Sequence, residues 1–427
     1  MIRSFARAED VRDIVTTILD ALVKGEHSET PTADAGERLV FVTPHLHPSA
    51  VMQAQRAHAA GFVTESKAVS SHGAILLKGF GIPALGRVKG LMEAAREGDD
   101  MIVDARAGKI ILRPGAGIIE RYVKRRENLR AKAESIAPVE FRTADGTAVR
   151  LMGNIGNPAQ ATLILQKALE GVGLFRTEFF ALQDGAIPGE EEQIEIYRQV
   201  IQTLNGRRLT VRTFDIGADK QVKSLRAKAE QNPSLGVRGI RRHLQGNGTE
   251  LTTQLRAILR AAHDSEIAIM IPMVTTLRDV RQAGRCLNKA IAALEKEGLP
   301  HSESVTFGAM IETPAAALIV ADILGEVDFV SLGTNDLLQY FMAADRDNED
   351  VIDYNDASAP AFRKLLQLII SEAIRVGRQD DVTICGEVAS RRHQIPVLLR
   401  MGYRSFSISP VMADDIREAI AQTDLRS

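Results

Sequence analysis

The sequence has little of what disulfide-rich, membrane-bound or nucleic-acid-binding proteins need. Its two cysteines, Cys286 and Cys385, lie far apart and form no CxxC or Cys/His pattern, which excludes a disulfide framework and a structural zinc site and fits a reducing cytoplasm. A formal net charge of −2 argues against a nucleic-acid partner. The most apolar long run is broken by Asp322 and Glu326, and the N-terminus mixes acidic and basic residues, so neither a membrane span nor a signal peptide is predicted.

What the sequence does contain is typical of a globular protein with more than one domain. Hydrophobic residues make up 45% and charged residues 25% of 427 positions, and this length predicts two or more cores. Residues 1–30 read as an amphipathic helix over 8–24 followed by a linker. Residues 31–115 carry short β-like runs between Gly/Pro turns, which predicts a compact α/β domain. In the connecting segment 116–146, residues 116–135 are expected to form a charged helix.

The remaining segment, residues 147–427, alternates apolar β-like runs with helical stretches of similar length. Eight such runs predict a (β/α)8 TIM-type barrel, with a doubly wound open sheet as the competing fold. The eight runs are VRLMGNI, GVGLFRTE, RLTVRTFD, PSLGVRGIR, IAIMIPMV, VTFGAMIE, FVSLGTND and VTICGEV.

Polar side chains at the ends of these runs favour the barrel. In a barrel the C-terminal strand ends converge on one mouth, which is where catalytic groups are found. Any one of these residues could belong to a structural salt bridge, but six of eight runs end in this way. The residues are Arg176 and Glu178, Arg212 and Asp215, Arg238, Glu312, Asn335 and Asp336, and Cys385 and Glu387.

Four arginines are expected at this mouth: Arg176, Arg212, Arg238, and Arg346, which follows the seventh run. Guanidinium groups pair with carboxylate and phosphate oxygens in two-pronged fashion, so the pocket should take a small polyanion.

Glu312 and Asp336 end neighbouring runs, and carboxylates are the ligands that Mg²⁺ prefers. The alternative is that these two acids only neutralise the arginines.

Two further residue types, cysteine and histidine, could contribute chemistry. Cys385 is an inert apolar residue or, at a polar strand end, a proton donor or nucleophile, whereas Cys286 in a helical stretch is expected to be structural. His72 follows the N-capping residues Ser70 and Ser71, so it falls in the first turn of a helix. There the helix dipole keeps the imidazole neutral and the free N–H groups favour a phosphate. The alternative is a capped or solvent-facing histidine.

These motifs resemble a known family. EGVGLFRTEFF, TVRTFDIGADK, NPSLGVRGIR, QLRAILRAA, MIETPAAA, SLGTNDLLQY, ADRDN and ICGEVA resemble, in order and spacing, the phosphoenolpyruvate-binding barrel of enzyme I of the sugar phosphotransferase system, the phosphoenolpyruvate-protein phosphotransferases. SSHGAILLKGFGIPALG stands in the place of that family's phosphohistidine segment. The resemblance implies that residues 31–115 form a small swivelling α/β phosphohistidine domain preceding the barrel.

The resemblance also implies a reaction. In Mg²⁺-dependent transfer, phosphoenolpyruvate would give its phosphoryl group to His72, Cys385 would protonate the enolate to give pyruvate, and the phosphate would pass to a phosphocarrier protein. The family further implies a homodimer formed through the barrel. Its implied binding residues are Arg176 and Arg212 for the phosphate, Arg238 and Lys220 nearby, Arg346 and Asn335 for the phosphate and carboxylate ends, and Glu312 and Asp336 for the metal.

The chain departs from the family pattern at two places. The family's carrier-docking domain is expected to be absent, and Lys67, Ala68 and Val69 replace the usual Gly-Gly-Arg before His72, while Lys78 replaces an arginine after it. No segment resembles an ATP-grasp domain, so phosphoenolpyruvate should be the only phosphoryl donor. Two other functions remain open: a lyase or hydrolase acting on phosphoenolpyruvate or a keto acid, and a phosphoenolpyruvate-sensing module without turnover.

Overall fold

The computed structural model describes most of the chain. The described residues are 39–46, 50–51, 53–54, 57, 59–65, 77, 82–105, 108–135, 140–178, 180, 186–217, 230–346 and 348–426. The chain divides into two compact units, Met1–Leu129 and Arg130–Ser427. The expected helix over residues 8–24, His72 with its helix, and Lys220 lie outside the described residues.

The smaller unit contains two separate sheets. In the first, β1 (Val40–Thr43), β2 (Gly61–Thr64) and β3 (Ala84–Leu85) pair in parallel, and in the second, β4 (Met101–Asp104) and β5 (Lys109–Leu112) are antiparallel. The one-turn helix α4 spans Leu91–Ala94. Buried Phe62 and Val63 of β2 form part of its core. The β-like runs expected here are confirmed, and β3 is an additional short strand.

A long charged helix, α5 (Ala116–Ser135), follows β5 and matches the predicted helix over residues 116–135. Its Arg125 pairs with Asp104 of β4 at 3.6 Å. The division between the two units falls within this helix.

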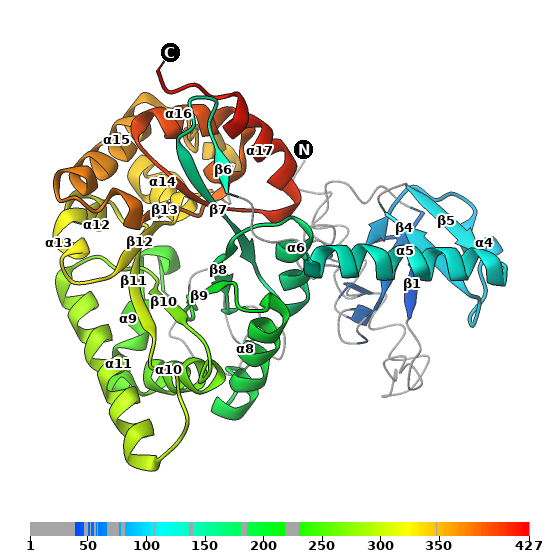
Figure 1. Cartoon of the computed structure of the whole chain (residues 1–427), viewed down its shortest axis with the longest axis horizontal. Coiled ribbons are helices and arrows are strands. Elements are labelled where there is room, and N and C mark those ends of the chain that lie inside the picture. Colours follow the sequence, from blue (N-terminus) through cyan, green and yellow to red (C-terminus); the bar gives the residue numbers. More distant parts are fainter. Residues whose placement is uncertain are drawn as a thin grey trace. The chain divides into compact units, whose positions relative to one another are not determined.

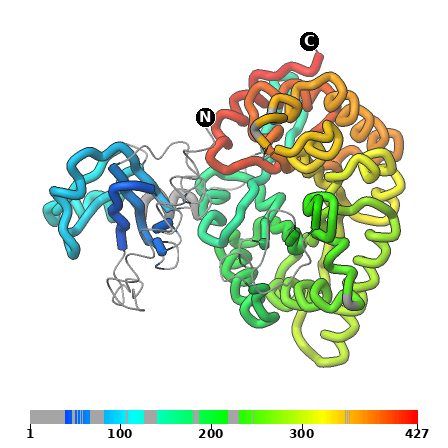
Figure 2. Tube along the Cα trace, turned by 180° about the vertical axis from the view of Figure 1, so that it is seen from behind, coloured from blue at the N-terminus to red at the C-terminus, as the bar shows by residue number. Residues whose placement is uncertain are grey.

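The larger unit is a closed barrel of eight parallel strands, so the predicted barrel is confirmed over the open sheet (Figure 1). Closure comes from β14, which pairs in parallel with β7, and the short strand β6 (Phe141–Arg142) adds to β7 in antiparallel orientation. Seen from behind, the C-terminal segment lies beside the β6–β7 segment (Figure 2). The barrel strands are β7 (Ala148–Ile155), β8 (Gly171–Arg176), β9 (Arg208–Arg212), β10 (Ile267–Ile271), β11 (Val305–Ile311), β12 (Phe329–Leu332), β13 (Val382–Ile384) and β14 (Ser405–Ile408).

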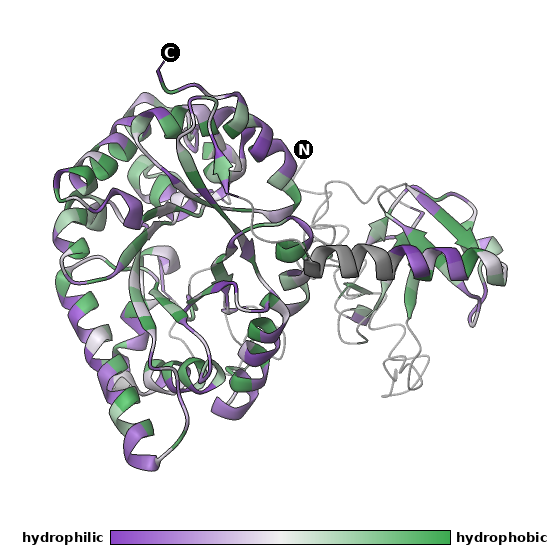
Figure 3. Ribbon diagram, viewed as in Figure 1, coloured by the Kyte–Doolittle hydropathy of each residue, from purple (hydrophilic) through white to green (hydrophobic). Residues whose placement is uncertain are grey.

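Helices surround the barrel and cover its strands. The longest, α11, is capped by Thr276, whose hydroxyl accepts from the N–H of Asp279, and it carries hydrophobic and hydrophilic residues on different faces (Figure 3). Its buried face includes Cys286, as expected for a structural cysteine. The α-helices of this unit are α6 (Ala161–Gln166), α8 (Glu190–Leu204), α9 (Ile240–His243), α10 (Thr249–Ala261), α11 (Leu277–Glu297), α12 (Pro314–Leu318), α13 (Val320–Leu324), α14 (Thr334–Met342), α15 (Pro360–Arg375), α16 (Ile395–Met401) and α17 (Ala413–Gln422).

One of the eight predicted strands was wrong. Residues 233–241 form a 3-10 helix at Pro233–Leu235 and the beginning of α9, because Pro233 favours a helical start and Gly239 takes a left-handed φ of 53°. The eighth strand is instead β14, which sequence analysis missed because Ser405 and Ser407 make it look half polar. Both serines are buried, and their hydroxyls bond to Thr383 and Asn154.

Because residues 233–241 do not form a strand, the later barrel strands each move one place earlier in the order. β12 is the sixth barrel strand, so Arg346 follows the sixth strand and not the seventh. Among the helices in the described part of the chain, none has the length and apolar character needed to cross a bilayer.

Candidate active site at the C-terminal ends of the barrel strands

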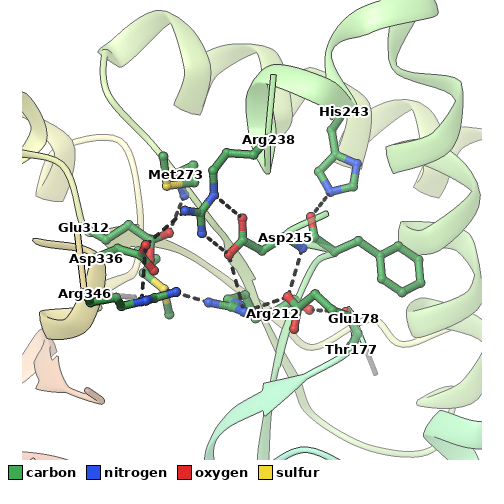
Figure 4. Close-up of polar contacts among 12 residues, drawn as sticks. Thr177, Glu178, Arg212, Asp215, Arg238, His243, Met273, Glu312, Asp336 and Arg346 are labelled. Atoms are coloured by element: carbon green, nitrogen blue, oxygen red, sulfur yellow. Dashed lines mark hydrogen bonds and ion pairs between the residues drawn. The ribbon is translucent and has the colours of Figure 1, made fainter. Parts of the chain in front are cut away.

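Charged side chains from neighbouring strands converge at one end of the barrel (Figure 4). Arg212 is the last residue of β9, Glu312 follows β11 directly, and Asp336 lies in the first turn of α14 after β12. The strand order makes β11 and β12 neighbours, as predicted from the sequence. The C-terminal strand ends thus bring residues 100 or more positions apart into one ionic cluster.

Arg212 is buried and held by two acids. Its Nη2 donates to Glu178 Oε1 at 2.7 Å and lies 3.7 Å from Asp215 Oδ2. Burial alone would lower the pKa of Arg212, but the two carboxylates outweigh that effect and hold the pKa above its usual value. Within the described residues, the buried Nε of Arg212 has no hydrogen-bond partner. One donor of this guanidinium is thus left without a partner in the described part of the chain.

The guanidinium of Arg238 forms more hydrogen bonds than that of Arg212. Its Nε and Nη2 donate to the two oxygens of Asp215, at 3.1 and 2.7 Å, and its Nη1 donates to Asp336 Oδ1 and to the hydroxyl of Tyr340, both at 3.0 Å. The side chain is 1% exposed. Arg238 therefore fixes the orientation of Asp215 and Asp336 in the structure.

Glu312 and Asp336 form a pair of buried like charges. Glu312 Oε1 accepts from the backbone N–H of Met273 at 2.6 Å. Gly333 permits the close approach of the other oxygen, since a Cβ at this position would lie 2.7 Å from Glu312 Oε2. Burial raises the pKa of Glu312 to about 7, and the charges of Asp336 and Asp215 add to the rise.

Arg346 and Arg176 also lie at this mouth. Arg346 Nη1 lies 3.5 Å from Asp336 Oδ1, as drawn in Figure 4. Arg176 ends β8 and stays accessible to solvent. Enclosure by the barrel wall and the neighbouring charge of Arg212 lower the pKa of Arg176.

Cys385 follows β13 at the same end of the barrel. Its thiol is 1% exposed and donates to the carbonyl of Leu332 at 3.2 Å. Burial raises the pKa of this thiol to about 11, so Cys385 keeps its proton at neutral pH. The carbonyl of Cys385 accepts from Asn154 Nδ2 at 2.8 Å, which ties the residue to β7. Asn335, the remaining predicted site residue, accepts from the N–H of Glu387 at 2.9 Å.

The carboxylate pair fits a hard cation. Within the described residues no cluster of three or more His, Cys, Asp and Glu side chains has metal-site geometry. Mg²⁺, however, usually takes one or two carboxylates together with substrate oxygens and water. Burial and then the charges of Asp336 and Asp215 raise the pKa of Glu312, so a cation bound at the two carboxylates would offset their repulsion. Glu312 and Asp336 are thus suitable ligands for Mg²⁺.

Sequence reasoning missed the residues that brace this cluster. Tyr340, Met273 and Asn154 contact Arg238, Glu312 and Cys385, respectively. Met273 does so from a left-handed backbone with φ of 56°, a conformation that its residue type gives no reason to expect. Asn154 and Tyr340 do stand near the ends of β7 and α14 in the sequence, but position alone does not reveal their partners.

Comparison with known families identifies the two units as domains of phosphoenolpyruvate-utilising enzymes. The family described as "PEP-utilising enzyme, PEP-binding domain" matches residues 130–425, and "PEP-utilising enzyme, mobile domain" matches residues 36–108.

Curated relatives identify the family more specifically. Proteins named phosphoenolpyruvate-protein phosphotransferase match from Priestia megaterium (38% identity, 97% of this chain and 72% of that protein), Bacillus sp. (37%, 94% and 69%) and Haloferax volcanii (36%, 98% and 73%). The chain belongs to the phosphoenolpyruvate-protein phosphotransferase family, as the sequence motifs predicted.

Proposed function

We propose that the protein catalyses Mg²⁺-dependent transfer of the phosphoryl group of phosphoenolpyruvate to His72, releases pyruvate, and passes the phosphate to a carrier protein. The observation that carries the proposal is the arrangement of Arg212 beside the buried Glu312 and Asp336 at the C-terminal strand ends. A dianionic phosphate and a carboxylate need several cationic partners, and a site of this kind supplies them without the cost of reorganisation.

The arginines would contact different parts of phosphoenolpyruvate. Arg212, with a donor still available, and the accessible Arg176 would hold the phosphoryl oxygens. Arg346 and Asn335 would hold the phosphate and carboxylate ends of the substrate. The four donors of Arg238 to acids and Tyr340 support a positioning role, in which it keeps Asp336 and Asp215 in place. Lys220 is proposed as a further phosphate contact.

Glu312 and Asp336 would hold the metal, which supplies charge neutralisation to the phosphoryl and carboxylate oxygens of the substrate. Before the metal binds, Glu312 is partly protonated near neutral pH, since its pKa is about 7. The backbone N–H of Met273 holds Oε1 of Glu312 in one orientation, so the carboxylate is set in place by the fold.

The transfer itself would be an in-line displacement. A ring nitrogen of His72 forms a bond to phosphorus as the bond from phosphorus to the enol oxygen breaks, and the arginines stabilise the charge on the equatorial oxygens. The enolate then takes a proton at its methylene carbon from the thiol of Cys385, giving pyruvate. A thiol with a pKa of about 11 holds its proton until the basic enolate forms. The thiolate regains a proton from water.

The test is the intact mass of the chain after incubation with phosphoenolpyruvate and Mg²⁺, together with the amount of pyruvate formed. Without an acceptor, we expect one acid-labile phosphoryl group and one equivalent of pyruvate per chain, and neither product with His72→Ala. Cys385→Ser should slow pyruvate release while the chain remains folded.

Two results would contradict the proposal. Continuous pyruvate release that His72→Ala leaves unchanged would identify a lyase or hydrolase. Binding of phosphoenolpyruvate without either product would identify a sensing module. If the histidine is labelled, addition of candidate phosphocarrier proteins and light-scattering mass measurement would test the proposed acceptor and the proposed homodimer.

A further inference from the structure

The opposite end of the barrel contains a polar cavity of about 130 Å³. Its lining residues stand at or before the N-terminal ends of the strands: Arg208 is the first residue of β9, Thr306 the second of β11, and Asp328 directly precedes β12. The ionic cluster with Glu312 and Asp336 lies at the other strand ends. The cavity is therefore separate from the proposed active site.

Positive and negative side chains line different arcs of this cavity. Arg150 and Arg208 come from β7 and β9, whereas Asp328, Asp380 and Asp381 precede β12 and β13. In the closed barrel β12 lies three strands from β9, and β13 lies two strands from β7. Within the described residues, none of these acids forms an ion pair with Arg150 or Arg208. A ligand with charges of both signs would match this separation.

Arg208 is the exposed first residue of β9 on the positive arc. It forms no hydrogen bond or ion pair within the described part of the chain, and its guanidinium stacks over the Phe329 ring with 5.3 Å to the centroid. Stacking leaves the N–H edge of a guanidinium able to bind a carboxylate. Partial burial and the nearby charge of Arg150 lower the pKa of Arg208, although the charges of Glu266 and Asp381 act in the opposite direction.

Of the three aspartates on the negative arc, two have partners within the protein. Asp328 Oδ2 accepts from the N–H of Phe307 at 2.7 Å, and Asp381 pairs with Arg378. Asp380 makes no hydrogen bond or ion pair within the described residues. Its carboxylate, with the second oxygens of its two neighbours, can accept from an ammonium group.

A buried hydroxyl supplies an independent indication of a ligand. Ser331 lies on β12, lines the cavity and is 1% exposed, yet its Oγ has no hydrogen-bond partner among the described residues. The thiol of Cys385 is close enough to interact with it, but a thiol is a weak partner. A buried hydroxyl left without a bond costs free energy, so a polar molecule in the cavity would stabilise it.

We propose that this cavity binds a small zwitterion of the α-amino acid class. The carboxylate contacts Arg208 and Ser331, and the ammonium group lies toward Asp380 and Asp381. The cavity volume of about 130 Å³ corresponds to roughly four waters of about 30 Å³ each, which suits the smallest members of this class, from glycine to serine. A neighbouring depression of about 400 Å³ shares Arg208 and Thr306 with the cavity.

Calorimetric titration of the full chain tests this site with glycine, L-alanine and L-serine as probes. We expect at least one of them to bind with a Kd of ~1 mM or lower. Acetate and methylammonium, which carry one charge each, should bind at least about tenfold more weakly, because each satisfies only one arc. Saturating phosphoenolpyruvate with Mg²⁺ should leave amino-acid binding unchanged, since that ligand occupies the other end of the barrel.

Single substitutions test which side chains contact the amino acid. Arg208→Gln should weaken binding about tenfold or more and Ser331→Ala by a smaller factor, whereas Arg198→Gln on the exposed face of α8 serves as the charge-matched control. Asp380→Asn gives a second, exposed position should Arg208→Gln fail to fold. The proposal is overturned if no probe binds at millimolar concentration, which leaves water as the occupant. It is equally overturned if acetate binds as well as the amino acids, if phosphoenolpyruvate displaces them, or if a folded Arg208→Gln or Asp380→Asn binds them normally.

Discussion

At the scale of single residues, Arg212 is both a partner of buried acids and a proposed ligand of the phosphate. Its Nη2 contacts Glu178 and Asp215, and a lysine would keep the charge but lose the planar fork. We expect Arg212→Lys to lower the rate of phosphoenolpyruvate-dependent pyruvate formation by ~10²–10³-fold, the usual effect of removing one preorganised donor. Steady-state assays measure this. Arg198→Lys, at an exposed pair on α8, is the matched control and should keep full activity.

Glu312 makes the stability of the chain depend on pH. Its folded pKa of about 7 lies above the ordinary value of 4.5, so between these values the folded state binds more protons than the unfolded state. The free energy of unfolding therefore falls as the pH rises through this window, and the loss persists above it. We expect Glu312→Gln to remove that loss, on the order of 3 kcal/mol at most. Denaturant unfolding near pH 5 and near pH 8 measures it, and an equal pH slope in parent and variant would contradict the assignment.

Mg²⁺ should act on the same carboxyl pair. A divalent cation between Glu312 and Asp336 neutralises both charges, so it stabilises the folded chain most when Glu312 is ionised. We expect Mg²⁺ alone to raise the melting temperature at about pH 8 more than at about pH 5. Asp336→Asn should lose this gain. An unchanged gain in that variant would place the metal elsewhere.

At the scale of elements, two glycines on neighbouring elements should respond in opposite directions. Gly308 lies in β11, where an added Cβ would overlap the ring of Phe329. Gly284 lies in α11, and an added Cβ would meet only Phe307 at 4.0 Å. We expect Gly308→Ala to destabilise the chain by ~1–3 kcal/mol through overpacking. Gly284→Ala should stabilise it by ~0.5–1 kcal/mol, since alanine favours the helix. Denaturant midpoints of the two variants check both signs.

At the scale of the whole molecule, the two units Met1–Leu129 and Arg130–Ser427 should unfold as separate transitions, because each has its own buried core. Phosphoenolpyruvate and Mg²⁺ should raise the temperature of the larger transition, which belongs to the unit containing Glu312, and leave the smaller one in place. Scanning calorimetry with and without the ligands measures both. A single transition, or an equal shift of two, would contradict this separation.

The barrel could be predicted from the sequence because its strands are short apolar runs at regular spacing. The prediction failed at Ser405 and Ser407, where serines are buried through hydrogen bonds to Thr383 and Asn154. It also failed around Arg238, where the apolar residues of PSLGVRGIR suggest a strand although its proline and two glycines disfavour one. Whether a serine faces solvent or a barrel interior depends on partners about 20 to 250 residues away, and local composition does not report them.

The sequence by itself determined the family, the barrel and the residue types at its mouth, because motif order and strand periodicity are local properties of the chain. Only the tertiary structure decided how those residues act on one another. Barrel closure buries Glu312 beside Asp336 and raises its pKa, commits Arg238 to Asp215, and leaves Nε of Arg212 available. The same closure creates the cavity around Arg208 and Ser331 at the other end. Burial and the pairing of distant charges depend on the path of the whole chain, so no segment of the sequence contains them.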